Sequence, residues 1–453
     1  MYIIEINIEN IKLIHKLKID FRRGGGEPRM WTVLVGRNGL CKTSILQAIA
    51  IAASGADRAN QLAEATSFPD RRSPELPTSV NALFRFGDIR HPVRQYPLFN
   101  KFESPPFLYS AVVIPPKWKL FRSFSNMIPS TSEPQLEYVG DRTVGIRTDF
   151  KPDGLQTARA EGLPYWFVTG YGVVRNLPYP KTSERSEDPV RDRLETLFGK
   201  GRLTGTGFID LFDDTKLALA YSKTLKTALL NHKDMIPGIA DLELRGKGGV
   251  TSAKELLESH RIEMQAGKKT VKIPVTWLSH GYQATISWIA DLIGQMFWEA
   301  GKPVKLEDME GLVLIDEIDL HLHPLWQVGL ISALKAAFPR VQFIATTHSP
   351  MMLTGLEADE IIILDQDNEG NIKVVEPNRS PDLMTGSELL DVFFGIDKLY
   401  PVQTGEDLQR YGYLSTNAGR SDTEDAEMKR ILARLKAAGV EPGWEPKPRR
   451  KRK

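Results

Sequence analysis

The strongest constraint on this sequence is a loop that joins an apolar run to a helical pattern. Residues 31–35 read Trp-Thr-Val-Leu-Val, which is typical of a buried strand, and residues 43–53 show helical spacing of apolar side chains. The loop between them reads Gly36-Arg37-Asn38-Gly39-Leu40-Cys41-Lys42-Thr43. Its spacing is that of a P-loop, G-x-x-x-x-G-K-[ST], in strand–loop–helix context. Backbone N–H groups at such a helix N-terminus bind phosphate oxygens, so the sequence predicts a phosphate site here.

The side chains of this loop have separate expected roles. Lys42 is predicted to reach the β- and γ-phosphates, and the Thr43 hydroxyl is predicted to bind Mg²⁺. The remaining predicted cofactor-binding residues of the segment are Gly36, Arg37, Asn38, Gly39, Leu40, Cys41 and Ser44. Cys41 replaces the second glycine of the pattern and adds bulk beneath the phosphates. Nucleotide affinity and hydrolysis rate are therefore left open.

A second apolar run ends in two acids. Residues 312–315 read Leu-Val-Leu-Ile, and Asp316 and Glu317 follow. The carboxyl ends of strands in an open α/β sheet are where ligands bind, so these acids are expected beside the loop. Asp316 is the predicted Mg²⁺ ligand and Glu317 the predicted general base. The alternative is a strand end with two solvated acids.

Two further motifs precede and follow these acids. Ser279, Gly281 and Gln283 form an L-S-x-G-x-Q pattern at the start of a helix, where a hydroxyl and N–H groups make a second phosphate-binding surface. The alternative is an ordinary N-cap serine. His348 directly follows the strand 341–345 and is predicted to contact the γ-phosphate and orient water. The alternative for His348 is a structural turn histidine.

The pattern along the chain predicts an α/β fold with a mixed sheet. Strands and helices alternate from 279 to 365, which favours a parallel sheet, whereas frequent prolines between 69 and 134 favour an antiparallel β-subdomain. Residues 165–174 and 271–277 are predicted strands, 207–232 and 251–265 are predicted helices, and 181–205 is a predicted mobile loop. We expect one main α/β domain, called the head below, formed by two separate parts of the chain, 1–60 and 276–385. Between them, 61–180 is expected to form a β-rich subdomain of the head and 181–275 a mainly helical insertion. Residues 386–453 are expected to form a C-terminal extension with a basic tail.

Composition excludes several classes of protein. The 453 residues include one cysteine, Cys41, so an intramolecular disulfide is excluded and a reducing cytosol is expected. We find no apolar run long enough for a membrane span, and the start does not resemble a signal peptide. The net charge of +2 is too small for a dedicated nucleic-acid binder, so any DNA contact needs a local patch. The basic residues 449–453 are one candidate, with a solvated tail as the alternative.

The four motifs, in this order, resemble those of ABC-class ATPases of the RecF/SMC/OLD type. The match rests on the P-loop, the Ser279 signature, the stretch DEIDLHLHPLWQ with Asp316 and Glu317, and FIATTHSP with His348. The resemblance implies ATP and Mg²⁺ as cofactors, and a head-to-head homodimer in which Ser279 faces the γ-phosphate bound by Lys42 of the other copy. Asp319 corresponds to the D-loop, which lies across that interface. The segment from Gly170 to Arg175 corresponds to a lid or Q-loop.

The spacing of the motifs narrows the class. Roughly 230 residues separate Lys42 from Ser279, which is the length of an inserted domain. Transporter ATPases have the signature much nearer the P-loop, and the long arms of SMC proteins need a longer segment. The compact form is similar to the stand-alone ATPases of bacterial anti-phage systems, such as the PtuA proteins of Septu and the ATPase of PARIS. That resemblance implies an ATPase that gates a separate effector, an HNH nuclease or a toxin. The alternatives are a RecF-like DNA-repair ATPase and a scaffold in which ATP only holds the dimer.

Overall fold

The computed structural model divides the chain into two units, Met1–Leu383 and Met384–Lys453. It describes residues 1–24, 26–86, 107–128, 155, 167–175, 188–200, 203, 214–244, 258–377, 379–396, 402–442 and 446–448. The basic tail 449–453 lies outside the described residues.

An antiparallel sheet forms one layer of the first unit. Its strands, in the spatial order β2-β1-β4-β5-β6, are β2 (Ile14–Asp20), β1 (Tyr2–Ile11), β4 (Thr78–Arg85), β5 (Phe107–Ile114) and β6 (Arg122–Ile128). The antiparallel strands predicted within 69–134 are present, and they continue a hairpin from the first twenty residues. Alternating side chains of β1 and β4, such as Ile6, Ile8 and Val80, reach the core on the face that carries α1.

A six-stranded sheet forms the next layer. Its order is β14-β13-β3-β12-β11-β7, with bounds Ile372–Val375, Ile361–Gln366, Trp31–Val35, Val341–Thr346, Gly311–Ile315 and Val168–Tyr171. All neighbours pair in parallel except β13 and β14. The predicted parallel sheet is therefore confirmed. Four of the strands (β3, β7, β11 and β12) are buried along their whole length, as expected for a sheet covered on both faces.

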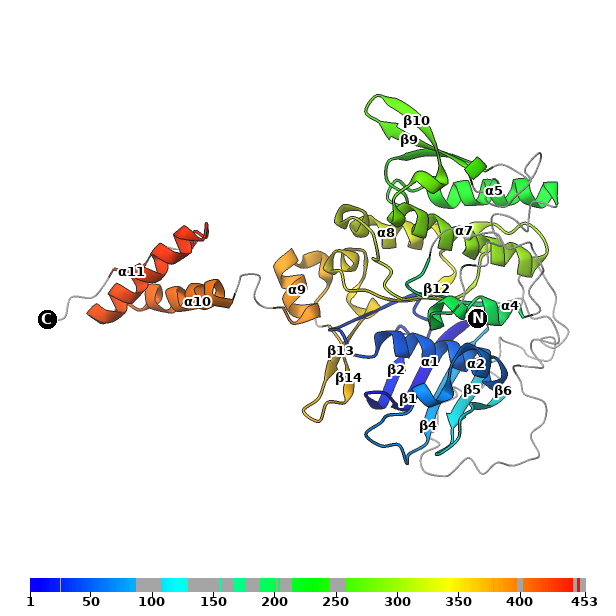
Figure 1. The fold of residues 1–453 in the computed structure, drawn as a ribbon, viewed down its shortest axis with the longest axis horizontal. Coiled ribbons are helices and arrows are strands. Elements are labelled where there is room, and N and C mark those ends of the chain that lie inside the picture. Colours follow the sequence, from blue (N-terminus) through cyan, green and yellow to red (C-terminus); the bar gives the residue numbers. More distant parts are fainter. Residues whose placement is uncertain are drawn as a thin grey trace. The chain divides into compact units, whose positions relative to one another are not determined.

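Helices cover the two faces of this sheet (Figure 1). The first pair is α1 (Lys42–Ser54) with α2 (Ala56–Leu62), and the second is α7 (His280–Ala300) with α8 (Pro324–Ala337). Leu312 and Leu314 of β11 share a core cluster with α1 and the antiparallel sheet, so α1 lies between the two sheets. Figure 1 shows α7 and α8 beyond the other face.

The segment between β7 and α7 is mixed rather than mainly helical in its described part. It contains α4 (Pro189–Asp192), α5 (Thr215–Leu230), and a small sheet of β8 (Ile239–Glu243), β9 (Arg261–Ala266) and β10 (Lys269–Pro274). The predicted helix over 251–265 is wrong in its last residues, because 261–266 pair with β10 through a two-residue turn. Gly267, with a φ of 63°, opens that turn and breaks any helix. Residues 188–200, predicted as part of a loop, include α4 and a 3-10 turn.

Short 3-10 turns connect the larger elements of this unit. They are η1 (Ala65–Ser67), η3 (Glu195–Phe198), η5 (Val275–Trp277), η6 (Leu306–Asp308), η7 (Pro350–Gly355), η8 (Ala358–Glu360) and η9 (Pro381–Leu383).

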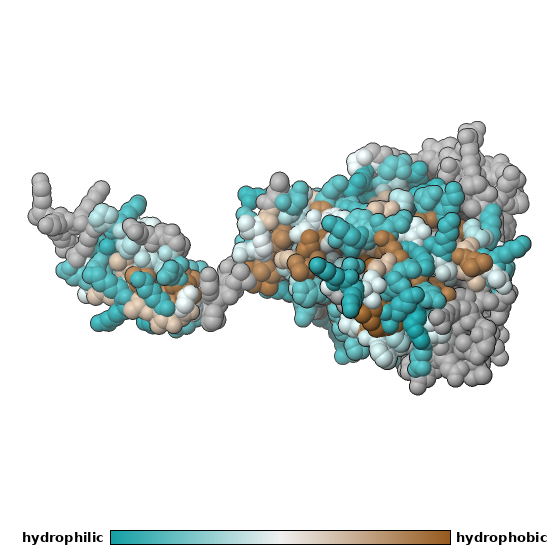
Figure 2. Space-filling view, turned by 90° about the horizontal axis from the view of Figure 1, so that it is seen from above, coloured by the Kyte–Doolittle hydropathy of each residue, from teal (hydrophilic) through white to brown (hydrophobic). Residues whose placement is uncertain are grey.

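On the face shown in Figure 2, hydrophobic residues form separate groups among hydrophilic ones. No helix in the described part of the chain is long and apolar enough to cross a membrane.

The second unit is helical in its described residues. It contains α9 (Gly386–Phe394), α10 (Val402–Thr416) and α11 (Asp422–Ala437). Helices α10 and α11 pack through a small core of Tyr411, Leu414, Met428, Ile431 and Leu435. Ion pairs from Arg434 to Asp407 and from Arg410 to Glu427 join the same two helices.

Candidate active site

The P-loop connects the end of β3 to α1, as the sequence predicts. Gly36 has a φ of 144°, and a Cβ there would lie 2.6 Å from the Leu364 carbonyl oxygen, so only glycine fits. The Lys42 ammonium donates to the carbonyl oxygens of Gly36 at 2.7 Å and Arg37 at 2.9 Å. Burial lowers the pKa of Lys42, and Asp316 partly opposes that shift. In this structure Lys42 is therefore bound to its own loop, in a position from which it can turn to phosphates.

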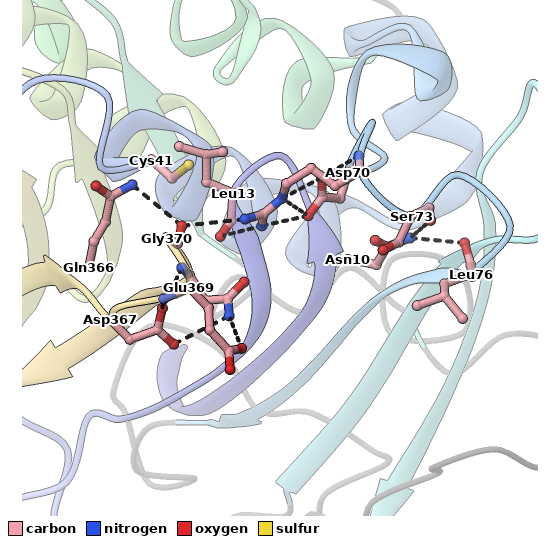
Figure 3. A network of polar contacts seen from close by, with 12 residues as sticks. Asn10, Leu13, Cys41, Asp70, Ser73, Leu76, Gln366, Asp367, Glu369 and Gly370 are labelled. Carbon is pink, nitrogen blue, oxygen red and sulfur yellow. Dashed lines mark hydrogen bonds and ion pairs between the residues drawn. The ribbon is translucent and has the colours of Figure 1, made fainter.

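Cys41 occupies the position where the P-loop pattern has glycine. It is the N-cap of α1 and has left-handed backbone angles, φ 57° and ψ 20°. Its side chain lies beside Leu13 of the β1–β2 turn (Figure 3), and both pack against the core. Burial raises the pKa of its thiol. The sequence predicts that the Cys41 side chain adds bulk beneath the phosphates. Its backbone angles add a second effect, because a residue with a Cβ in the left-handed region is destabilised by about 1–2 kcal/mol.

This geometry predicts the effect of substitutions at Cys41 on stability. A β-branched side chain suits left-handed angles poorly, so Cys41→Val is expected to lower the free energy of unfolding by about 1–2 kcal/mol. Cys41→Gly is expected to stay within about 1 kcal/mol of the wild type, because relief of strain offsets the loss of packing and the added entropy of the unfolded chain. Urea unfolding of both variants measures the difference. Equal stabilities of the valine and glycine variants would contradict the prediction.

Asp316 joins three segments at the carboxyl ends of the strands. Its two carboxylate oxygens accept hydrogen bonds from Thr43 Oγ1 at 2.8 Å and from Thr346 Oγ1 at 2.6 Å. Asp316 is buried, Thr43 is the second residue of α1, and Thr346 ends β12. The Thr43 hydroxyl and the Asp316 carboxylate are hard oxygen ligands of the kind Mg²⁺ takes together with substrate phosphates. The residues present therefore fit the predicted metal site.

Glu317 has an unusual backbone conformation that is fixed from both sides. Its φ is 48°, in the left-handed region. Its N–H donates to Thr346 Oγ1 at 2.7 Å, and its carbonyl oxygen accepts from Arg175 Nη2 at 2.5 Å. A strained non-glycine residue held by its surroundings is typical of functional sites. These contacts fix the backbone of Glu317, and the charge of its carboxylate, like that of Asp316, acts on the Lys42 ammonium.

The loop that carries His348 is held by Asp319. One Asp319 oxygen accepts from the Thr347 hydroxyl at 2.5 Å and from the His348 N–H at 3.3 Å. Partial burial and the cation of Lys42 lower the pKa of His348, so its ring is neutral at neutral pH. In this structure Asp319 bonds within its own chain, and its predicted place across a dimer interface stays a prediction.

The signature motif forms the N-terminus of α7. Ser279 is the exposed N-cap, and its side chain makes no capping hydrogen bond. A Cβ on Gly281 would lie 2.4 Å from the His321 carbonyl oxygen, so this close approach requires glycine. The Gln283 amide donates to the carbonyl oxygen of Leu278 at 2.6 Å and therefore supports the loop. Nucleotide contacts of Ser279, Gly281 and Gln283 stay predictions.

Lys12 lies at the P-loop but was not among the predicted site residues. Its ammonium donates to Ser44 Oγ at 2.8 Å, so the Ser44 hydroxyl is already engaged. Lys12 has a φ of 51° in the β1–β2 turn. Nearby, Arg72 binds Asp70 at 2.7 Å and the carbonyl oxygen of Leu13 at 3.2 Å. Figure 3 labels Asp70 and Leu13 within the same polar network. No local motif marks Lys12; only the tertiary contact between the hairpin and α1 identifies it.

The fold and these strand-end residues together have the arrangement expected of an ABC-type ATPase head, in which the P-loop lies beside a strand end that carries two consecutive acids. A family model described as "AAA domain, putative AbiEii toxin, Type IV TA system" matches residues 189–353. The chain is similar to the Septu protein PtuA of Bacillus mycoides (strain KBAB4), with 26% identity over 437 residues, 96% of this chain and 50% of that protein. The predicted resemblance to PtuA-like ABC-class ATPases is confirmed.

Two further proteins match this chain over a shorter stretch or at lower identity. The Retron Ec83 probable ATPase of Escherichia coli is 34% identical over 143 residues, 32% of this chain and 24% of that protein. A crystal structure of the Smc head bound to the C-winged helix domain of ScpA has a TM-score of 0.47 at 17% identity, covering 83% of this chain and 98% of that one. The chain thus spans half or less of the length of these two curated relatives.

Proposed function

We propose that this chain binds and hydrolyses ATP with Mg²⁺. The observation that carries the proposal is the Asp316 carboxylate, which holds Thr43 of the P-loop helix and Thr346 of β12 while Glu317 follows directly. Bound Mg²⁺ would be held by Thr43 and Asp316 and would neutralise charge on the phosphates. Lys42 and the backbone N–H groups of the P-loop would hold the phosphates of ATP.

The same residues can carry the proton transfer. Glu317 takes the role of general base and accepts a proton from the attacking water, and neutral His348 hydrogen-bonds the γ-phosphate or that water. Ser279 is exposed at the N-terminus of α7, where its hydroxyl makes no capping bond and α7 adds N–H groups. We therefore propose that a second copy of the chain presents this surface to the nucleotide, which makes the working form a homodimer.

Metal removal tests the proposal directly. Purified chain is expected to release phosphate from ATP in the presence of Mg²⁺, and excess EDTA is expected to reduce the rate by at least about 100-fold, because metal and Lys42 share the charge stabilisation. A phosphate-release assay measures both rates. Turnover that is unchanged in EDTA would contradict the metal site, and ATP binding without any turnover would favour the scaffold alternative.

We further propose that the ATP cycle serves bacterial anti-phage defence by gating a separate effector, an HNH nuclease or a toxin. The names of the relatives, a Septu protein and a retron ATPase, support this role. Affinity purification of the chain from its native host during phage infection tests it, since a nuclease or toxin should be recovered. Turnover stimulated by DNA at low salt, with no such partner recovered, would instead favour the RecF-like alternative.

A further inference from the structure

Arg175 is a buried cation close to the two acids that follow β11, Asp316 and Glu317. It lies four residues after the end of β7, which pairs in parallel with β11, so the two strands end side by side. Only 3% of Arg175 is exposed to solvent. The carboxylates whose charges act on its guanidinium are Asp316, Asp319 and Glu317. The parallel register therefore brings a guanidinium to the same sheet edge as the acids that follow β11.

The main contact of Arg175 is with the backbone of Glu317. Its Nη2 donates to the Glu317 carbonyl oxygen at 2.5 Å, while the Glu317 N–H donates to Thr346 Oγ1. The backbone N–H and carbonyl groups of Glu317 are thus both hydrogen-bonded, and the φ of Glu317 is 48°. A left-handed non-glycine residue persists only where the surroundings hold it. The Leu320 N–H also donates to the Glu317 carbonyl oxygen at 3.0 Å, so Arg175 supplies one of three contacts to this backbone, and the only one from a charged side chain among them.

Burial makes this arginine costly to retain. Within the described residues its Nε has no hydrogen-bond partner, and an unpaired buried N–H is destabilising. If this position were needed for packing alone, an apolar side chain would stabilise the fold at least as well. The carboxylates near the end of β11 balance the positive charge of Arg175. We therefore expect that Arg175 is present because of its contacts in this site.

The loop that carries Arg175 is itself anchored. The Gly170 N–H donates to the Arg193 carbonyl oxygen, and the Thr196 hydroxyl donates to the Gly170 carbonyl oxygen, both at 2.9 Å. A Cβ on Gly172 would lie 2.0 Å from the Thr196 carbonyl oxygen, so the backbones are in direct contact there. Gln47 of α1 donates to the Leu197 carbonyl oxygen at 3.1 Å, which connects the same segment to the P-loop helix. Arg175 therefore lies three residues beyond a backbone contact that ties the end of β7 to the segment 193–197.

We propose that Arg175 is a positioning residue for ATP hydrolysis, which holds the Glu317 backbone in its left-handed conformation so that the carboxylate faces the attacking water. The inference rests on the proposed ATPase function and adds a residue to it. Arg175 is not itself a base or a phosphate ligand in this proposal. Its removal should weaken the chemical step and leave binding of ATP in the P-loop almost unchanged.

Three variants test the assignment, with kcat and KM for ATP and the melting temperature measured for each. Arg175→Met is expected to lower kcat by about 10–100-fold with KM within about threefold, since loss of a supporting contact misplaces a catalytic group. Arg175→Lys keeps a charged donor for the Glu317 carbonyl and is expected to recover at least part of the loss. Arg340→Met is the control, because Arg340 pairs with Glu310 at 3.0 Å at the amino end of β12, the opposite end from Thr346.

The outcomes separate this inference from the proposed function. A wild-type chain that turns over ATP, with Arg175→Met within twofold of it, would overturn only the positioning role. Equal loss of kcat and ATP binding in both Arg175 variants, with a melting temperature lowered as in Arg340→Met or further, would show a merely structural arginine. A wild-type chain without turnover would count against the proposed function and this inference together.

Discussion

The Glu317→Gln variant is expected to bind ATP with nearly wild-type affinity and to hydrolyse it at least about 100-fold more slowly, the usual contribution of a positioned general base. Glutamine keeps the size of the side chain and the backbone contacts to Thr346 and Arg175, because both involve main-chain atoms of residue 317. It replaces the carboxylate with a neutral amide, so the base is removed together with its negative charge. The change should therefore affect kcat and spare the fold.

Two measurements test the effects on hydrolysis and on binding separately. Single-turnover hydrolysis reports the chemical step, and equilibrium binding of a fluorescent ATP analogue reports the P-loop. Glu307→Gln is the matched control, because Glu307 is an exposed acid of η6 that lies 3.9 Å from Lys305 and away from the strand ends. If Glu317→Gln retained more than a tenth of wild-type turnover, Glu317 would not be the base. If ATP-bound dimers accumulate in the variant, the proposed head-to-head assembly gains support.

Local sequence patterns were sufficient for the elements that carry the motifs. The apolar runs at 31–35, 312–315 and 341–345 each lie in a strand of the parallel sheet, and the helical spacing after the P-loop and the signature corresponds to α1 and α7. These segments are buried along most of their length, so their hydrophobic pattern is strong. The carboxyl-end rule for parallel strands then predicted that Asp316 would lie beside Thr43.

Contacts between distant segments were beyond such patterns. The pairing of β7 with β11 joins residues such as Thr169 and Val313, and nothing local in either run specifies the partner. The contact of Arg175 with Glu317 follows from that pairing. Residues 261–266 contain glutamate, methionine, glutamine and alanine, which favour helix, yet pairing with β10 prevails. Left-handed angles at Cys41 and Glu317 likewise depend on the surrounding fold.

The Lys42→Ala variant is expected to show the largest loss of nucleotide binding. The Lys42 ammonium makes two hydrogen bonds to the loop in this structure, and both donors can be redirected to the phosphates of ATP. Loss of one or two charge-assisted hydrogen bonds costs about 3 kcal/mol, or on the order of 100-fold in Kd. Because burial lowers the pKa of Lys42, binding of phosphate at alkaline pH should also be accompanied by uptake of a proton by the Lys42 amine.

Titration calorimetry with ATP measures both effects. The affinity of the wild type should fall as the pH rises through the lowered pKa of Lys42, because the neutral amine no longer attracts phosphate, whereas Lys42→Ala should lack that dependence. Lys335→Ala is the matched control, since Lys335 is a partly buried lysine of α8 that pairs with Glu360. The melting temperature of Lys42→Ala is measured alongside, because the change leaves the buried Gly36 carbonyl oxygen without this donor. An unchanged Kd would show that the backbone N–H groups of the loop hold the nucleotide without Lys42.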